Sequence, residues 1–183
     1  VISRADVTIS NSRIVGNGVD APGSFVTDKS YRAGAFYGYG SKSITIRNSE
    51  ISNNTATSAV VNGQTRSGAI DLVHDYPDWQ TPELAMKFKV INSTVSGNTA
   101  TDTVGAMRLY GNVAFELFNS TISNNASASN SNGSVVFQTG ETYPVSGSNT
   151  IAPTFSAVSS IIANSSGGGV DVGIRDTSTM PTL

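Results

Sequence analysis

Acidic, imidazole and aromatic side chains lie close together between residues 71 and 79. They are Asp71, His74, Asp75, Tyr76, Asp78 and Trp79. Clustered carboxylates can perform acid–base chemistry or bind Ca²⁺, and they are the groups that cleave glycosidic bonds. A basic residue is also available, because Arg108 lies three residues after Gly105 just as Asp71 lies three residues after Gly68. We therefore take these seven residues as the candidate ligand-binding site.

The same residues have a simpler structural interpretation. Asp71 and Arg108 would form an exposed ion pair worth at most about 1 kcal/mol, and the aromatic rings would only cover the loop. An enzyme of this kind should gather two acids at matching positions of successive repeats. Here the position of Asp71 is taken by Arg108 and then by Val136. We therefore assign no catalytic residue and keep a polysaccharide lyase or glycoside hydrolase as the alternative.

Composition excludes several classes of site. Cysteine is absent and His74 is the only histidine, so thiolate and multi-histidine metal sites are excluded, and a Ser-His-Asp triad would have to use His74. No phosphate-cradling glycine loop is present, and we expect neither a metal nor a cofactor. The net charge of −2 gives no footprint for nucleic acid, and no apolar run approaches the roughly 20 residues of a membrane span.

A repeat that begins Asn-Ser runs through most of the chain. It starts at Asn11, Asn48, Asn92 and Asn119, and a diverged copy starts at Ser159. Apolar residues recur four and two positions before each start and three positions after it. The three sets are Val7, Ile44, Phe88, Phe115 and Phe155; Ile9, Ile46, Val90, Leu117 and Ala157; and Ile14, Ile51, Val95, Ile122 and Ile162. The period of two predicts strands with one buried face.

A second strand signal follows a glycine between the copies. Two residues after Gly34, Gly68, Gly105, Gly133 and Gly168 stand Phe36, Ile70, Met107, Val135 and Val170. Uneven spacing around fixed strand cores is typical of a solenoid whose turns vary in length, and parallel crossovers are almost always right-handed. We predict an all-β fold, a right-handed parallel β-helix of about five coils over residues 1–175, with 176–183 as a tail or linker.

Stacked coils would place equivalent asparagines in ladders. The two sets are Asn11, Asn48, Asn92 and Asn119, and Asn17, Asn54, Asn98 and Asn125. Amides stacked in this way can hydrogen-bond along the axis, and a neighbour one coil away satisfies a group that would be costly to bury alone. We predict a structural asparagine ladder for both sets. Asn92 and Asn119 also begin Asn-x-Thr sequons, and we expect burial to keep them from accepting a glycan.

An apolar ridge is expected on the outer wall, at the position just before Asn-Ser. Three successive copies carry Ile91, Phe118 and Val158 there. Exposed apolar patches often mark contact surfaces, although cover by a loop would explain the ridge equally well. The ridge is therefore a possible interface.

The repeat Asn92-Ser-Thr-Val-Ser-Gly-Asn-Thr-Ala100, alternating with Gly-Ala strands, resembles the β-helix repeats of bacterial surface proteins. These are polymorphic outer-membrane-protein-like repeats, autotransporter passengers and related adhesins, and the resemblance covers about residues 7–174. It implies a secreted, cell-surface location. Because the chain starts at Val1 and shows no signal peptide, we also expect it to be part of a longer precursor. The implied role is a non-enzymatic adhesin or stalk.

Partners follow from the same hypothesis. They would be a surface glycan or a host or cell-surface protein. Open ends of a β-helix also expose unpaired strand edges, so self-association into a filament is a further expectation.

Overall fold

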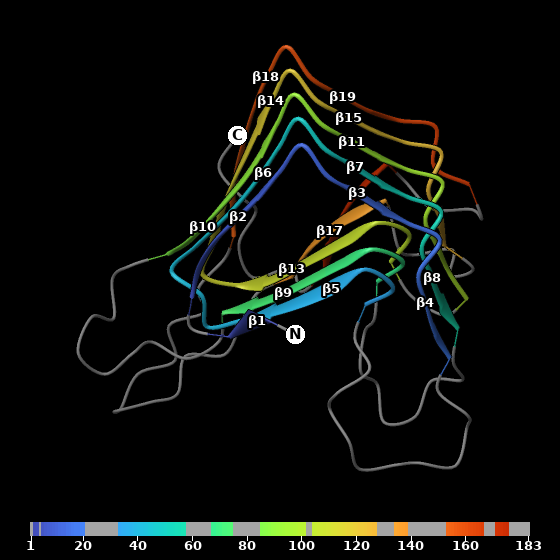
Figure 1. Cartoon of the computed structure of the whole chain (residues 1–183), viewed down its shortest axis with the longest axis horizontal. Coiled ribbons are helices and arrows are strands. Elements are labelled where there is room, and N and C mark those ends of the chain that lie inside the picture. The colour runs from blue at the N-terminus through green and yellow to red at the C-terminus, as the bar shows by residue number, and fades with distance from the viewer. Residues whose placement is uncertain are drawn as a thin grey trace.

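The strands of the chain stack into four parallel sheets that together form a right-handed β-helix (Figure 1). The computed structural model describes residues 2–3, 5–20, 33–57, 67–74, 85–101, 104–127, 134–138, 153–166 and 171–175. All strand pairs within these ranges are parallel, and the ranges contain no helix. The predicted fold class is confirmed.

Sheet A forms the floor of the helix in the view of Figure 1, and sheet B forms one of the two slopes above it. Sheet A contains β1 (Ile2–Ser3), β5 (Phe36–Tyr39), β9 (Ile70–His74), β13 (Met107–Gly111), β17 (Val135–Gln138) and β20 (Val172–Arg175). Sheet B contains β2 (Asp6–Ser10), β6 (Ser43–Arg47), β10 (Met86–Ile91), β14 (Val113–Phe118) and β18 (Thr154–Val158).

Two sheets of shorter strands complete each coil. Sheet C contains β3 (Arg13–Val15), β7 (Glu50–Ser52), β11 (Thr94–Ser96), β15 (Thr121–Ser123) and β19 (Ile161–Ala163). Sheet D contains β4 (Gly18–Asp20), β8 (Thr55–Thr57), β12 (Thr99–Ala100) and β16 (Ala126–Ser127). A coil therefore runs B, C, D, A, and sheets B and C each count five coils, as predicted. In the fifth coil the described residues form only an isolated bridge, from Ser166 to Ala126, in place of a sheet D strand. Sheet D was not expected, because its strands are too short for a period to show.

The core lies between the slopes and the floor, and it is built from the three predicted apolar columns together with the inward side chains of sheet A. Phe88 aligns with Phe115, and Phe115 with Phe155, with ring centroids 5.0 and 5.3 Å apart. In the middle coils these inward residues are at most 1% exposed. Burying one such side chain contributes about 1.5–3 kcal/mol, whereas strands of two to six residues have little stability of their own. Stacking of the columns therefore stabilises the coils.

The register of the fifth coil differs from the prediction. Val135 pairs with Val172, not with Val170, and Phe137 pairs with Ile174. Alignment on Gly168 was wrong by two residues because it followed the glycine and ignored the strand.

Candidate functional site

A ladder of asparagines occupies the corner between sheets C and D. The backbone N–H and Nδ2 of Asn54 donate to Oδ1 of Asn98 at 3.0 and 2.9 Å, and Asn98 donates in the same way to Asn125. Nδ2 of Asn98 also donates to the carbonyl of Ile51 at 3.1 Å. Asn54, Asn98 and Asn125 are fully buried. This part of the predicted ladder is confirmed, and Asn17 extends it to the first coil.

The asparagines that begin the repeats are exposed corner residues and do not form a buried ladder. Asn11, Asn48, Asn92 and Asn119 are exposed and hold φ between 45° and 51°, at the corner between sheets B and C. Their amides meet only at 3.3 Å, from Asn48 to Asn11 and from Asn92 to Asn48. Asparagine recurs here because it tolerates the left-handed conformation better than other side chains. The expectation of burial at Asn92 and Asn119 was wrong.

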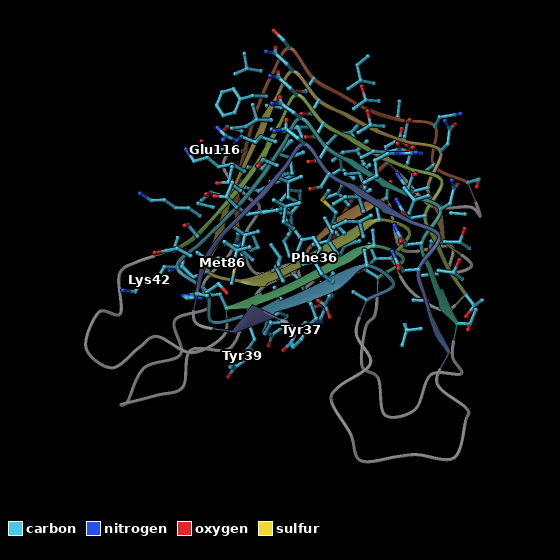
Figure 2. The ribbon with its side chains drawn as sticks, in the orientation of Figure 1. Phe36, Tyr37, Tyr39, Lys42, Met86 and Glu116 are labelled. Atoms are coloured by element: carbon cyan, nitrogen blue, oxygen red, sulfur yellow. The ribbon has the colours of Figure 1, made fainter. Side chains whose placement is uncertain are left out.

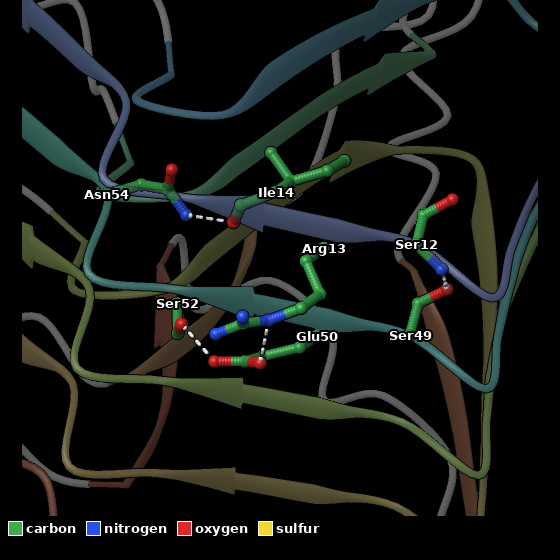
Figure 3. A network of polar contacts seen from close by, with 7 residues as sticks. All are labelled: Ser12, Arg13, Ile14, Ser49, Glu50, Ser52 and Asn54. Carbon is green, nitrogen blue, oxygen red and sulfur yellow. Dashed lines mark hydrogen bonds and ion pairs between the residues drawn. The ribbon is translucent and has the colours of Figure 1, made fainter.

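A serine ladder lies directly after this corner, and it is a feature that the apolar repeat pattern did not predict. Ser12, Ser49, Ser93 and Ser120 each donate a backbone N–H to the hydroxyl of the serine in the next coil, at 3.0–3.1 Å. Figure 3 shows the first of these bonds, from Ser12 to Ser49. Each hydroxyl in turn donates to the carbonyl two residues earlier, at 2.7–2.8 Å. The ladder reaches Ser160 in the fifth coil. The serine that follows every repeat start was the signal that could have revealed it.

The Arg108 and Asp71 side chains meet on the outer face of sheet A. The residues pair in register, and Nε and Nη2 of Arg108 donate to the two carboxylate oxygens of Asp71 at 2.7 and 3.0 Å. The predicted stacking is therefore confirmed. The prediction of an exposed pair was wrong, because Asp71 is 0% and Arg108 6% exposed.

Tyrosines surround the buried pair. Tyr37 pairs with Asp71 in register, and the guanidinium of Arg108 lies 5.5 Å from the ring centroid of Tyr110. Figure 2 shows Tyr37 and Tyr39 on the outer side of the floor, opposite the inward Phe36. Their ring centroids are 6.4 Å apart. Val136 follows Arg108 in the column, as the sequence indicated, so no second acid joins Asp71 there.

The remaining members of the predicted ligand site are not brought to this pair by the described strands. His74 ends β9, and strand alternation directs it to the face opposite Asp71. Asp75, Tyr76, Asp78 and Trp79 lie outside the described residues. Within the described ranges, no three His, Asp or Glu side chains gather as metal ligands would.

The predicted ridge lies on the outer face of sheet B. Ile91 pairs with Phe118, and Phe118 with Val158. Ile91 and Phe118 are half-buried, whereas Val158 is 52% exposed. The three side chains are therefore neighbours, and the accessible part of the ridge is at the fifth coil.

Charged residues also line sheets B and C. Lys89 and Glu116 pair at 2.8 Å on sheet B, and Arg13 and Glu50 pair at 2.7 Å on sheet C (Figure 3). The pKa of Glu50 lies below its usual value, first because Arg13 donates a hydrogen bond to the carboxylate and then because Ser52 does. Both pairs are partly or largely exposed, so each stabilises the fold only weakly.

Known proteins supply no identity for the chain. No family model matches it, and no curated protein or solved structure matches it significantly. The described residues also contain no helix of the length and apolarity needed to cross a membrane. The function must therefore be argued from the ladders and the outer walls.

Proposed function

We propose that the chain is a non-enzymatic structural and adhesive β-helix that acts at an extracellular surface. The observation that carries this proposal is the serine ladder, which continues through all five coils beside a buried asparagine ladder. Most hydrogen bonds of these side chains serve the neighbouring coil or the local turn. Such an arrangement favours a rod that holds its outer walls in fixed positions.

The extracellular part of the proposal rests on the resemblance to bacterial surface repeats. Labelling of intact source cells with an antibody to the chain tests it directly. We expect surface labelling and reduced attachment of cells that lack the protein. Labelling that appears only after the cells are permeabilised would contradict the location.

A carbohydrate-active enzyme remains the alternative, and the geometry of sheet A supports it less. Asp71 and Arg108 bind each other through both carboxylate oxygens, so neither is presented to a substrate as a free acid or base. Incubation with polygalacturonate followed by reducing-end and unsaturated-product assays is the test. Turnover that is lost in the variants Asp75→Ala and Asp78→Ala would replace the structural proposal with the enzymatic one.

A further inference from the structure

The outer face of sheet B collects the cations that have no acidic partner among the described side chains. Arg13, Lys89 and Arg108 are in ion pairs with Glu50, Glu116 and Asp71. The other described cationic side chains are Lys42, Arg47 and Lys87, and all three are exposed. Arg47 lies on β6, Lys87 lies on β10, and Lys42 directly precedes β6. Asp6 and Glu116 are the acidic side chains described on the same face, so four cations, counting Lys89, face two acids there. A chain of net charge −2 thus carries a modest positive excess on this wall.

The register fixes how these charges are spaced. The backbone N–H of Lys87 donates to the carbonyl of Lys42, so the two residues are neighbours on adjacent coils. Lys87 on β10 pairs with Ser43 on β6. Arg47 lies four residues after Ser43 on β6, which places it about 13 Å further along the strand direction. Figure 2 shows Lys42 at the lower edge of this slope and Glu116 higher on its outer side.

Hydroxyl groups and the Lys89–Glu116 ion pair lie between the unpaired cations. Thr8, Thr45, Lys89, Glu116 and Ser156 form the central outward column of sheet B. Arg47 is followed in its own column by Ile91 and Phe118. Hydroxyls suit hydrogen bonds to a sugar, and a half-buried aromatic and aliphatic ridge suits the apolar face of a pyranose ring.

We infer that the outer face of sheet B binds a linear acidic polysaccharide, with Lys42, Arg47 and Lys87 contacting its carboxylates. This inference rests on the proposed adhesive function and names the partner of that function. A flat wall with separated cations fits a polymer whose negative charges are spread along its length. The small positive excess and the overall negative charge disfavour nucleic acid, which needs a dense basic footprint.

Binding to polygalacturonate tests the inference, with uncharged dextran, duplex DNA and anionic phospholipid vesicles as comparison probes. Immobilised full chain should bind polygalacturonate, lose affinity as salt is raised, and ignore dextran. The triple variant K42Q/R47Q/K87Q should bind about tenfold more weakly, because each exposed charge contact contributes modestly. The single variants Arg47→Gln and Lys87→Gln should each retain the melting transition of the original chain. They measure the loss of affinity when only one positive charge is removed instead of three.

Arg13→Gln is the matched control, since it removes one positive charge from sheet C and should leave binding unchanged. Absence of polygalacturonate binding, or equal binding by the triple variant, would overturn the inference and leave the structural proposal standing. Tighter binding to DNA or to vesicles would overturn the choice of a polysaccharide. Depolymerisation of the bound probe would instead contradict the non-enzymatic function.

Discussion

The carboxamide of Asn98 connects three coils at the corner between sheets C and D, where the backbone leaves the hydrogen-bond pattern of the sheets. It accepts two hydrogen bonds from Asn54, and it donates to Asn125 and to the carbonyl of Ile51. Side chains of other shapes at this buried position would leave a backbone N–H and a carbonyl without partners. Unpartnered buried groups cost about 1–3 kcal/mol each.

Asn98→Ala should therefore lower the free energy of unfolding by roughly 3–5 kcal/mol, measured by urea denaturation. Asn92→Gly is the matched control, because Asn92 is exposed and glycine accepts its positive φ. The control should change stability by less than about 1 kcal/mol. Equal losses in both variants would show that the two asparagine sets are equivalent, contrary to the geometry.

The buried pair of Asp71 and Arg108 gives a second prediction for single side chains. Asp71→Leu and Arg108→Met should each cost about 3–5 kcal/mol, because each leaves a buried charge without its partner. The double variant should cost clearly less than the sum of the two. A double-mutant cycle from urea denaturation measures the coupling, and additive losses would contradict a paired, buried site.

The chemistry of single residues was only partly predictable from the sequence. Register alone brought Asp71 beside Arg108, since their equal offsets from Gly68 and Gly105 can be counted. The sequence offsets do not show which side chains are buried. The ion pair was therefore predicted at the surface and Asn92 in the interior. Backbone conformation explains the second error: the left-handed corner selects asparagine for its own φ, and repetition alone does not distinguish that requirement from a buried ladder.

Individual strands were predicted well where apolar residues alternate and poorly where a coil departs from the common pattern. Sheets B and C follow the three apolar columns without exception. The last floor strand, β20, was predicted two residues too early, because the prediction followed Gly168. At Gly34, Gly68 and Gly105 the glycine serves a close contact between backbones, so a glycine by itself does not mark where a floor strand begins.

Gly68 shows why that contact requires glycine. A Cβ there would overlap the carbonyl oxygen of Gly105 and lie 2.8 Å from the backbone nitrogen of Thr99. Both are backbone atoms that cannot move without breaking coil contacts. Gly68→Ala should therefore destabilise the fold by about 3 kcal/mol or more.

Gly18→Ala is the matched control for this contact, because its nearest neighbour would be 3.9 Å away. It should be neutral or slightly stabilising, since alanine reduces the freedom of the unfolded chain. Thermal unfolding of the two variants followed by circular dichroism compares them directly. A small effect at Gly68 would mean that the turn between sheets D and A can move apart.

The first and last coils formed by the described strands present different edges. Sheet A has six strands, because β1 lies before the first coil and β20 closes the fifth, whereas sheets B and C have five. If a second copy placed its β2 beside β18, its β1 would fall in the layer that β20 already occupies. Filament growth by simple stacking therefore requires that β1 be displaced, a condition that the repeats alone did not reveal.

The intact chain should consequently sediment as a monomer, and deletion of residues 1–5 should promote association. The half-buried Val7, Ile9 and Ile14 at one end, and Phe155 and Ile162 at the other, then provide the apolar contact. Analytical ultracentrifugation over a range of concentrations measures the difference. Circular dichroism separates ordered stacking from aggregation of unfolded chains. Filaments formed by the intact chain would show that β20 of a neighbouring copy readily displaces β1. Self-assembly would then again be part of the proposed function.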